Sequence, residues 1–288
     1  MPIPVAPLGP SRKPLQYADD MQAIASSPPS CAPFINSSLE ICLKDVGSWC
    51  ASKRLQLNAS KTEVMWFGTA AMLHKIPSDY LDISTSVGVI KPVSVVRDLG
   101  VWSDSELTMR EHVSHTAQAC FFHLLRLRSV RKIIGREVTI QLVCALVLSR
   151  LDYCNGVLVG LPSSTIAPLQ RVLHAAARLV DELKPNDHVT AALKTLHWLP
   201  VKQRIEYKVC LLMHKVCVSQ APAYMSDMVT ACSSVPERTR LRSSSSRDYI
   251  VPRTIRKLSE RAFSVSGPLL WNALLNNFTS QGLKLSSR

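Results

Sequence analysis

The sequence lacks a long apolar run, paired cysteines and a hydrolase nucleophile motif. Its longest strongly apolar stretch, residues 142–148, is far shorter than the roughly 20 residues of a membrane-spanning helix. The nine cysteines are scattered without a C-x-x-C pair, and no secretory pattern opens the chain. We therefore expect reduced thiols in an intracellular protein, in the cytoplasm or nucleus, with no membrane partner. Without a G-x-S-x-G elbow, the eight histidines do not indicate a hydrolase.

Acidic residues are scarce relative to basic ones. The chain has 34 Lys and Arg against 21 Asp and Glu, which gives a net charge of +13 and a pI near 9.5. Such an excess favours a polyanionic partner, of which nucleic acid is the usual one, although an ordinary basic surface would give the same total. The hydrophobic fraction of 47% is enough for one large or two ordinary domains with real cores.

Two adjacent carboxylates stand near the start of the chain, in the step Tyr17-Ala18-Asp19-Asp20. Enzymes that join nucleotides use two divalent ions about 3.5–4 Å apart, which stabilise both the attacking and the leaving oxygen. Magnesium prefers hard oxygen ligands, so an aspartate pair at a tight strand-turn-strand suits it. An Asp-Asp step by itself is also typical of a solvated turn.

Further blocks follow the aspartate pair in a recognisable order. They are Cys42-Leu43-Lys44-Asp45-Val46-Gly47-Ser48-Trp49, residues 55–63 with Lys61-Thr62-Glu63, Val96-Arg97-Asp98-Leu99-Gly100-Val101, Ser149-Arg150-Leu151-Asp152-Tyr153-Cys154-Asn155, Leu196-His197-Trp198-Leu199-Pro200, residues 243–249 and Arg261-Ala262-Phe263-Ser264-Val265. Together with the Tyr-Ala-Asp-Asp step, they resemble the reverse transcriptases of LINE-type (non-LTR, jockey-like) retrotransposons. The resemblance covers roughly residues 15–275.

The resemblance implies an α+β, mainly helical fold. We expect a Pro-rich disordered arm at residues 1–14, the C-terminal part of a polymerase palm at 15–103, a helical thumb and connector at 104–232, and a basic Arg- and Ser-rich tail at 233–288. The family's activity is RNA-directed DNA synthesis, which implies an RNA template, an RNA–DNA duplex and two Mg²⁺ ions, with no small-molecule cofactor. The sequence does not indicate an oligomeric state.

The resemblance also assigns roles to individual residues. Asp19 and Asp20 would be the catalytic metal ligands, and Tyr17 would pack beside them and position the primer end. Lys61 would donate a proton to the departing pyrophosphate, although it could equally cap a turn. Arg97 would contact the primer backbone, with a surface ion pair to Asp98 as the alternative.

The family's fingers, nucleotide-binding loop and earlier palm aspartate have no counterpart before Tyr17, and no acidic residue precedes Asp19. Because two-metal catalysis needs its whole set of groups, we expect this chain to be inactive alone. Alternatives are a non-catalytic nucleic-acid-binding or interaction protein derived from the element, and a decayed reading frame whose product folds poorly.

Hydrophobic periodicity predicts the elements. Apolar residues at spacings of three and four predict a helix within residues 33–55. A short strand is expected at 64–67, a hairpin within 87–101, and a capping box from Ser103 to Glu106. Further helices are expected at 107–134, 137–151, 165–183, 188–196 and 201–218, with a short one near Trp271.

Basic side chains recur on the expected helices and in the tail. The candidate nucleic-acid contacts are Arg128, Arg131, Lys132, Arg171, Arg178, Arg204, Lys208, Arg253, Arg256 and Lys257. Such contacts would position a duplex without reading its sequence, and Tyr249 and Phe263 could add base stacking. Each stripe could also be an ordinary solvated helix face, and the tail a solvated linker with serines open to phosphorylation.

One histidine-rich group resembles a zinc site: His112, His115, Cys120 and His123. On a helix these four side chains spread over roughly 140° of arc and about 16 Å of axis. We therefore do not expect them to hold one ion.

Overall fold

A computed structural model describes residues 12–280, apart from 18–19, 57, 86–87 and 235–246. The chain divides into two compact units, Met1–Glu111 and His112–Arg288. Helices take up 61% of it and strands 10%, so the expectation of a mainly helical α+β protein is confirmed. All strands belong to the first unit among the residues described, as two-stranded antiparallel pairs.

The first pair forms a hairpin around the aspartate step. Strands β1 (Arg12–Tyr17) and β2 (Asp20–Ala25) are antiparallel, with Tyr17 opposite Asp20 at the turn. The expected disordered arm at residues 1–14 is wrong for residues 12–14, which belong to β1; residues 1–11 lie outside those described. Pro14 is tolerated opposite Ala23 because, within the ranges described, β1 pairs with β2 alone, so the missing N–H breaks no inner ladder.

Helix α1 (Ala32–Ser52) confirms the periodicity over residues 33–55 and ends three residues earlier than expected. It follows a short 3₁₀ turn, η1 (Pro29–Cys31). Its buried face includes Ile35, Cys42 and Val46, and Met21 of β2 packs against the last two. The hairpin is therefore held against α1 by its Met21 face.

Two further hairpins complete the first unit. Strand β3 (Ile83–Thr85) pairs with β4 (Gly88–Ile90), and β5 (Val95–Asp98) pairs with β6 (Val101–Asp104). Leu99 (φ 42°) and Gly100 (φ 84°) both have positive φ, as a two-residue type I′ turn requires. The expected hairpin within 87–101 is confirmed at β5–β6, with β6 running on to Asp104.

Three short helical turns occupy the rest of this unit: η2 (Ala59–Lys61), α2 (Ala70–Leu73) and η3 (Ser78–Tyr80). The strand expected at residues 64–67 is wrong, because Val64 makes only an isolated bridge to Pro92. A single bridge gives a segment no ladder to extend along.

The capping box expected at Ser103 is also wrong, since Ser103 lies inside β6. Asp104 organises the turn before the next helix instead. Its carboxylate accepts hydrogen bonds from the backbone N–H groups of Glu106, Thr108 and Met109, at 3.2, 2.8 and 2.8 Å. It also accepts one from the Thr108 hydroxyl, at 3.0 Å. These bonds shape the chain just before the next helix begins at Arg110.

That helix, α3 (Arg110–Val143), is interrupted at Gly135, whose φ of 74° and ψ of 176° are not helical. A π-helical turn, η4 (Cys144–Leu148), and α4 (Ser149–Asp152) continue it. The two helices expected at 107–134 and 137–151 are therefore confirmed, separated by one glycine. The backbone combination at Gly135 is essentially restricted to glycine.

Helices α5 (Ser163–Asp181), α6 (Thr190–Thr195) and α7 (Val201–Cys217) match the remaining expectations to within a few residues. The short turn η5 (Asn155–Leu158) precedes α5 and packs against α7. Helix α3 is joined to the C-terminal end of α5 by hydrogen bonds of Arg131 and Arg136. Each helix has buried apolar residues, such as Leu124 and Leu127 of α3 and Val172 and Leu173 of α5.

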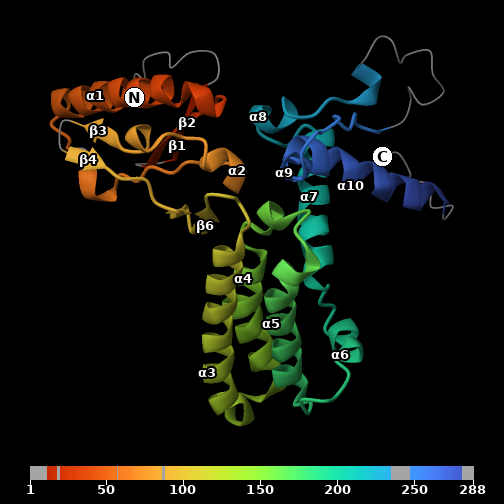
Figure 1. Cartoon of the computed structure of the whole chain (residues 1–288). Helices are drawn as coiled ribbons and strands as arrows, with labels where there is room; N and C mark the ends of the chain where they lie inside the picture. Colours follow the sequence, from red (N-terminus) through yellow and green to blue (C-terminus); the bar gives the residue numbers. More distant parts are fainter. Residues whose placement is uncertain (1–11, 18–19, 57, 86–87, 235–246, 281–288) are drawn as a thin grey trace. The chain divides into compact units, whose positions relative to one another are not determined.

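The described residues after 222 include more helix than the mostly extended tail that the sequence predicts. After α8 (Ala223–Ser226) and η6 (Cys232–Ser234) come α9 (Lys257–Glu260) and α10 (Phe263–Ser280). Helix α10 confirms the helix expected near Trp271 and packs on α7 (Figure 1), where Met213, Tyr249 and Trp271 form one buried cluster. Gly267 permits this approach, because a Cβ there would lie 2.8 Å from the Met213 sulfur.

Candidate nucleic-acid interface

The aspartate hairpin presents exposed polar side chains. Asp20 is the first residue of β2 and is exposed, and Tyr17 opposite it is 67% exposed. Asp19, the other expected metal ligand, lies outside the residues that the structure describes. The described half of the step therefore leaves one carboxylate and one phenol ring accessible to a ligand.

Both faces of β2 connect this hairpin to its surroundings, one through Met21 and the other through Gln22. Met21 packs on the Cys42 and Val46 cluster of α1, and the Gln22 amide donates a hydrogen bond to Asp98 Oδ1 at 2.5 Å. Because side chains alternate along a strand, Gln22 lies on the same face as Asp20. The β5–β6 hairpin is thus brought to the face of β2 that carries the aspartate.

Arg97, on the same β5–β6 hairpin, is exposed and lies over the Trp102 ring, with 5.7 Å between its guanidinium carbon and the ring centroid. Trp102 is its direct partner across the hairpin. Stacking of this kind orients the guanidinium while leaving its N–H groups able to donate. Arg97 is therefore accessible, and its contact with a primer phosphate stays a prediction.

Lys61 is exposed at the end of η2. Asn58 organises this turn: its side-chain oxygen accepts hydrogen bonds from the Ser60 N–H at 3.1 Å and the Ser60 hydroxyl at 2.6 Å. The Lys61 N–H also closes the turn by donating to Asn58 O at 3.1 Å, so the alternative of a turn role for Lys61 stays open. Its role as a proton donor stays a prediction.

The described residues do not provide a complete magnesium site. Asp20 offers one accessible carboxylate, and Asp98 on the neighbouring hairpin is bonded to Gln22. Within the described ranges, no group of three or more His, Cys, Asp or Glu side chains converges on one point. Two ions need more oxygen ligands than this, so the described carboxylates alone do not form the two-ion site of the family.

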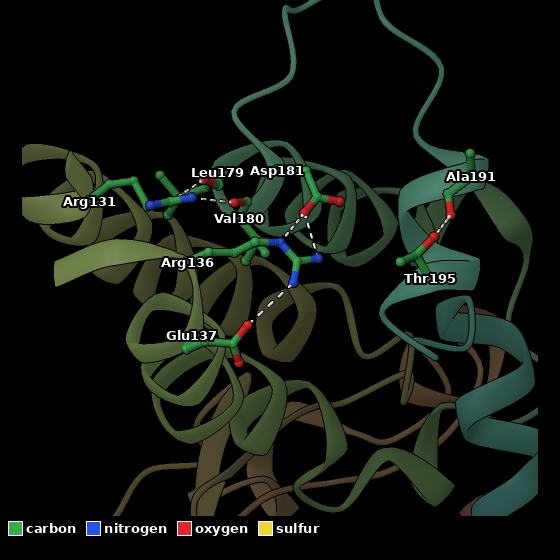
Figure 2. A network of polar contacts seen from close by, with 8 residues as sticks. All are labelled: Arg131, Arg136, Glu137, Leu179, Val180, Asp181, Ala191 and Thr195. Atoms are coloured by element: carbon green, nitrogen blue, oxygen red, sulfur yellow. Dashed lines mark hydrogen bonds and ion pairs between the residues drawn. The ribbon is translucent and has the colours of Figure 1, made fainter.

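In the second unit, the expected stripe of Arg128, Arg131 and Lys132 divides in two. Arg128 and Lys132 are exposed, but Arg131 is only 9% exposed. Figure 2 shows its guanidinium pointing at the end of α5, where Nε donates to Leu179 O at 3.2 Å and Nη2 to Val180 O at 2.7 Å. These are carbonyls of the last helical turn, which lack partners within the helix. Arg131 is therefore a structural cap, and its assignment to nucleic acid is wrong.

Arg136 forms a second tie at the same place, which the sequence analysis missed. It bonds to Asp181 Oδ1 through Nε and Nη2, both at 2.9 Å, and lies 3.7 Å from Glu137 (Figure 2). The partners are 45 residues apart, so no local spacing could have indicated the pair. Together Arg131 and Arg136 fasten the Gly135 bend of α3 to the C-terminus of α5.

Of the two arginines expected to contact nucleic acid from α5, one is exposed and the other is half-buried. Arg171 is exposed, whereas Arg178 is half-buried and donates to Asp187 O at 3.4 Å. Burial, and then the charge of Arg178, lowers the pKa of His174 below its ordinary value of 6.5. The His174 ring nitrogen Nε2 lies 2.7 Å from the Gln170 amide nitrogen. Arg171 is the strongest candidate for a phosphate contact on this helix.

On α7, Arg204 is committed to an internal ion pair. Its Nε and Nη2 donate to the two carboxylate oxygens of Asp152, at 2.8 and 2.5 Å, and its side chain is 15% exposed. Asn155 also donates to Asp152, at 3.3 Å. The assignment of Arg204 to nucleic acid is therefore wrong, while Lys208 on the same helix is half-exposed.

Arg126 is an accessible cation that the sequence analysis overlooked. It is exposed on α3, and its guanidinium carbon lies 5.3 Å from the centroid of the exposed Phe122 ring. The spacing of four residues places both on one helix face and was the available signal. An aromatic ring next to arginine is a surface suited to nucleotide bases.

The tail residues divide in the same way. Arg253, Arg256 and Lys257 are exposed as expected, but Tyr249 is only 9% exposed and packs against Met213 and Trp271. Base stacking by Tyr249 is therefore wrong, because its ring belongs to the core.

No family model, curated protein or solved structure matches this chain. Over the part of the chain that the structure describes, every helix is too short or too polar to cross a membrane.

Proposed function

We propose that this chain derives from the reverse transcriptase of a LINE-type, non-LTR retrotransposon and that it binds a nucleic-acid duplex without extending a primer. The observation that carries the proposal is the Gln22–Asp98 hydrogen bond. It joins the Tyr-Ala-Asp-Asp hairpin to the hairpin that the resemblance assigns to gripping the primer. The two lie 76 residues apart in the chain, so this meeting is a feature of the fold and not of local sequence.

In this proposal the first unit is a palm fragment and the helices from α3 to α7 are a thumb and connector. Tyr17, Asp20 and Arg97 are accessible on the palm fragment. In the second unit Arg128, Lys132 and Arg171 provide accessible positive charge on helices that have well-buried opposite faces. Side chains of this kind bind phosphates and position a duplex.

Absence of polymerisation follows from the ligand set. Among the described residues, Asp20 is an accessible carboxylate of the aspartate step, and no group of three or more His, Cys, Asp or Glu side chains converges on one point. Phosphoryl transfer by two ions depends on the complete constellation, and partial sets lose activity far more than additively. The chain is therefore proposed as a binder of its ancestral substrate class.

The binding part is tested with a fluorescently labelled RNA–DNA hybrid titrated with the protein between 50 and 200 mM salt. We expect the logarithm of the binding constant to fall linearly with the logarithm of salt concentration. Replacing Arg128, Lys132 and Arg171 by glutamine should make that slope shallower by about 2.7, at about 0.9 per lost contact. The control variant replaces three exposed lysines of the first unit by glutamine and so loses the same charge; they are Lys44, Lys53 and Lys75.

Equal losses in both variants would mean that binding follows net charge alone, and absence of salt-dependent binding would overturn the proposal. The polymerase part is tested by primer extension on the same hybrid with magnesium. We expect no incorporation. Incorporation that disappears in Asp19→Ala and Asp20→Ala would show an active polymerase and refute the second half of the proposal.

A further inference from the structure

A segment of the second unit displays an isoleucine among basic side chains. Ile255 is 102% exposed, so its side chain makes no appreciable contact with the rest of the protein. Arg253, Arg256 and Lys257 next to it are all exposed. An exposed isoleucine alone needs no explanation, but here it stands in a dense positive cluster on a segment whose two ends are fixed.

The start of this segment is clamped by α10. Tyr249 N–H donates to Asn272 Oδ1 at 3.0 Å, and Asn272 Nδ2 donates to Tyr249 O at 2.8 Å. Trp271 Nε1 donates to Arg247 O at 3.0 Å, and an antiparallel bridge joins Tyr249 to Ala231. The Asn272 amide thus pairs with the backbone of Tyr249 as a neighbouring strand would.

The other end is fixed through α9 and the residue after it. Arg261 Nη2 donates to Val157 O of η5 at 3.3 Å, and its side chain packs against Gly160, where an added Cβ would lie 3.0 Å from Arg261 Cγ. Helix α10 then begins at Phe263. Both ends of the exposed stretch therefore rest on the α7, α10 and η5 framework. Such preorganisation reduces the entropy lost when a ligand binds.

We propose that Ile255 is a wedge that enters between two base steps of a duplex whose phosphates are held by Arg253, Arg256 and Lys257. This rests on the nucleic-acid binding proposed above and names the surface and the contact by which it occurs. Isoleucine is among the apolar side chains that unstack a base step from the minor groove, and flanking cations offset the cost by gripping the backbone. A membrane surface suits the segment less well, because interfacial binding needs a broad apolar face.

The test uses the full chain and a 16-base-pair RNA–DNA hybrid whose DNA strand carries 2-aminopurine, which fluoresces more strongly when unstacked. Probe positions are varied along the strand. Ile255→Ala should abolish the fluorescence increase and weaken binding about tenfold, with the salt slope unchanged. The matched control is Ile133→Ala, which removes a second highly exposed isoleucine, 85% exposed on α3 beside Lys132. Ile133→Ala should bind and unstack like the wild type.

Replacing Arg253, Arg256 and Lys257 together by glutamine should make the salt slope shallower by about 2.7. Melting curves that match the wild type show that these surface variants are folded. The wedge is refuted if the wild type binds the hybrid without any fluorescence increase, or if the two isoleucine variants behave alike. Binding to anionic phospholipid vesicles but not to the hybrid would refute both this inference and the proposed function.

Discussion

The neighbouring residues Arg131 and Lys132 offer the sharpest test of how the helical unit is built. Both are basic and both belong to the stripe expected to contact nucleic acid, yet Arg131 is 9% exposed while Lys132 is exposed. We predict that Arg131→Met destabilises the protein and that Lys132→Met does not. Methionine retains an apolar stem for packing, so the first change removes mainly the guanidinium.

The magnitude follows from the two hydrogen bonds of Arg131. Each joins a charged donor to a carbonyl at the end of α5, and such a bond contributes about 1.5–3 kcal/mol. Water can reach a helix end, so the low end of that range applies and the total is about 3 kcal/mol. For a unit of this size, 1 kcal/mol changes Tm by roughly 2–4 °C, so Arg131→Met should lower Tm by about 6–12 °C.

Thermal unfolding followed by circular dichroism measures the change in Tm. Titration with a nucleic-acid duplex measures the change in binding. Lys132→Met should keep its stability within about 0.5 kcal/mol of wild type. If Lys132 contacts a phosphate, the salt slope of Lys132→Met should be shallower by about 0.9. Arg131 is not a structural cap if Arg131→Met melts like the wild type and weakens duplex binding as Lys132→Met does.

Three further predictions concern other parts of the chain. Gly135→Ala should cost about 1–3 kcal/mol in thermal unfolding, because the backbone conformation of Gly135 is restricted to glycine. The control is Gly47→Ala in α1, where the added Cβ meets no atom within 4 Å and should stabilise the protein by about 0.5–1 kcal/mol. Equal losses in the two variants would contradict a special backbone requirement at Gly135. Asp104→Ala should cost about 1–3 kcal/mol in denaturant unfolding, because four donors lose their charged acceptor. An unchanged midpoint would show that these bonds do not stabilise the turn before α3. Burial, partly offset by the charge of Arg150, raises the pKa of the Cys120 thiol to about 11. The unfolded chain therefore loses the Cys120 proton at lower pH than the folded protein does. The free energy of unfolding should fall as pH rises from about 9 to 11. At pH 8 a thiol reagent should label the exposed Cys154 quickly and Cys120 only after unfolding, and equal labelling rates would disprove that burial.

Local patterns predicted most of the elements because each element depends on its own residues. The three-and-four spacing located α1, α5 and α7 to within a few residues, since an amphipathic helix must turn its apolar side chains to one face. The β5–β6 hairpin was likewise found, because Gly100 permits the turn that its two strands require. The strand at 64–67 failed because a strand needs a partner, and its own residues do not specify one.

Side-chain roles in the candidate interface were harder to predict than the helices that carry them. Spacing placed Arg128, Arg131 and Lys132 on one side of a helix, but the direction of each long side chain depends on what packs alongside. Arg131 lies where the last carbonyls of α5 need donors, 48 residues further along the chain. Arg204 lies opposite Asp152, 52 residues away. The spacing of residues along one helix carries no information about partners so far away in the sequence.

The sequence alone determined the helices, the aspartate step at Asp19 and Asp20, and the basic balance of the chain, because these depend on residue identity and short-range periodicity. Only the tertiary structure decided which basic groups are available to a partner. It turned Arg131 and Arg204 inward, left Arg171 outside, and fixed the ends of a segment that displays Ile255. The reason is that exposure and hydrogen-bond partners arise from contacts between residues far apart in the chain, and folding alone brings those residues together.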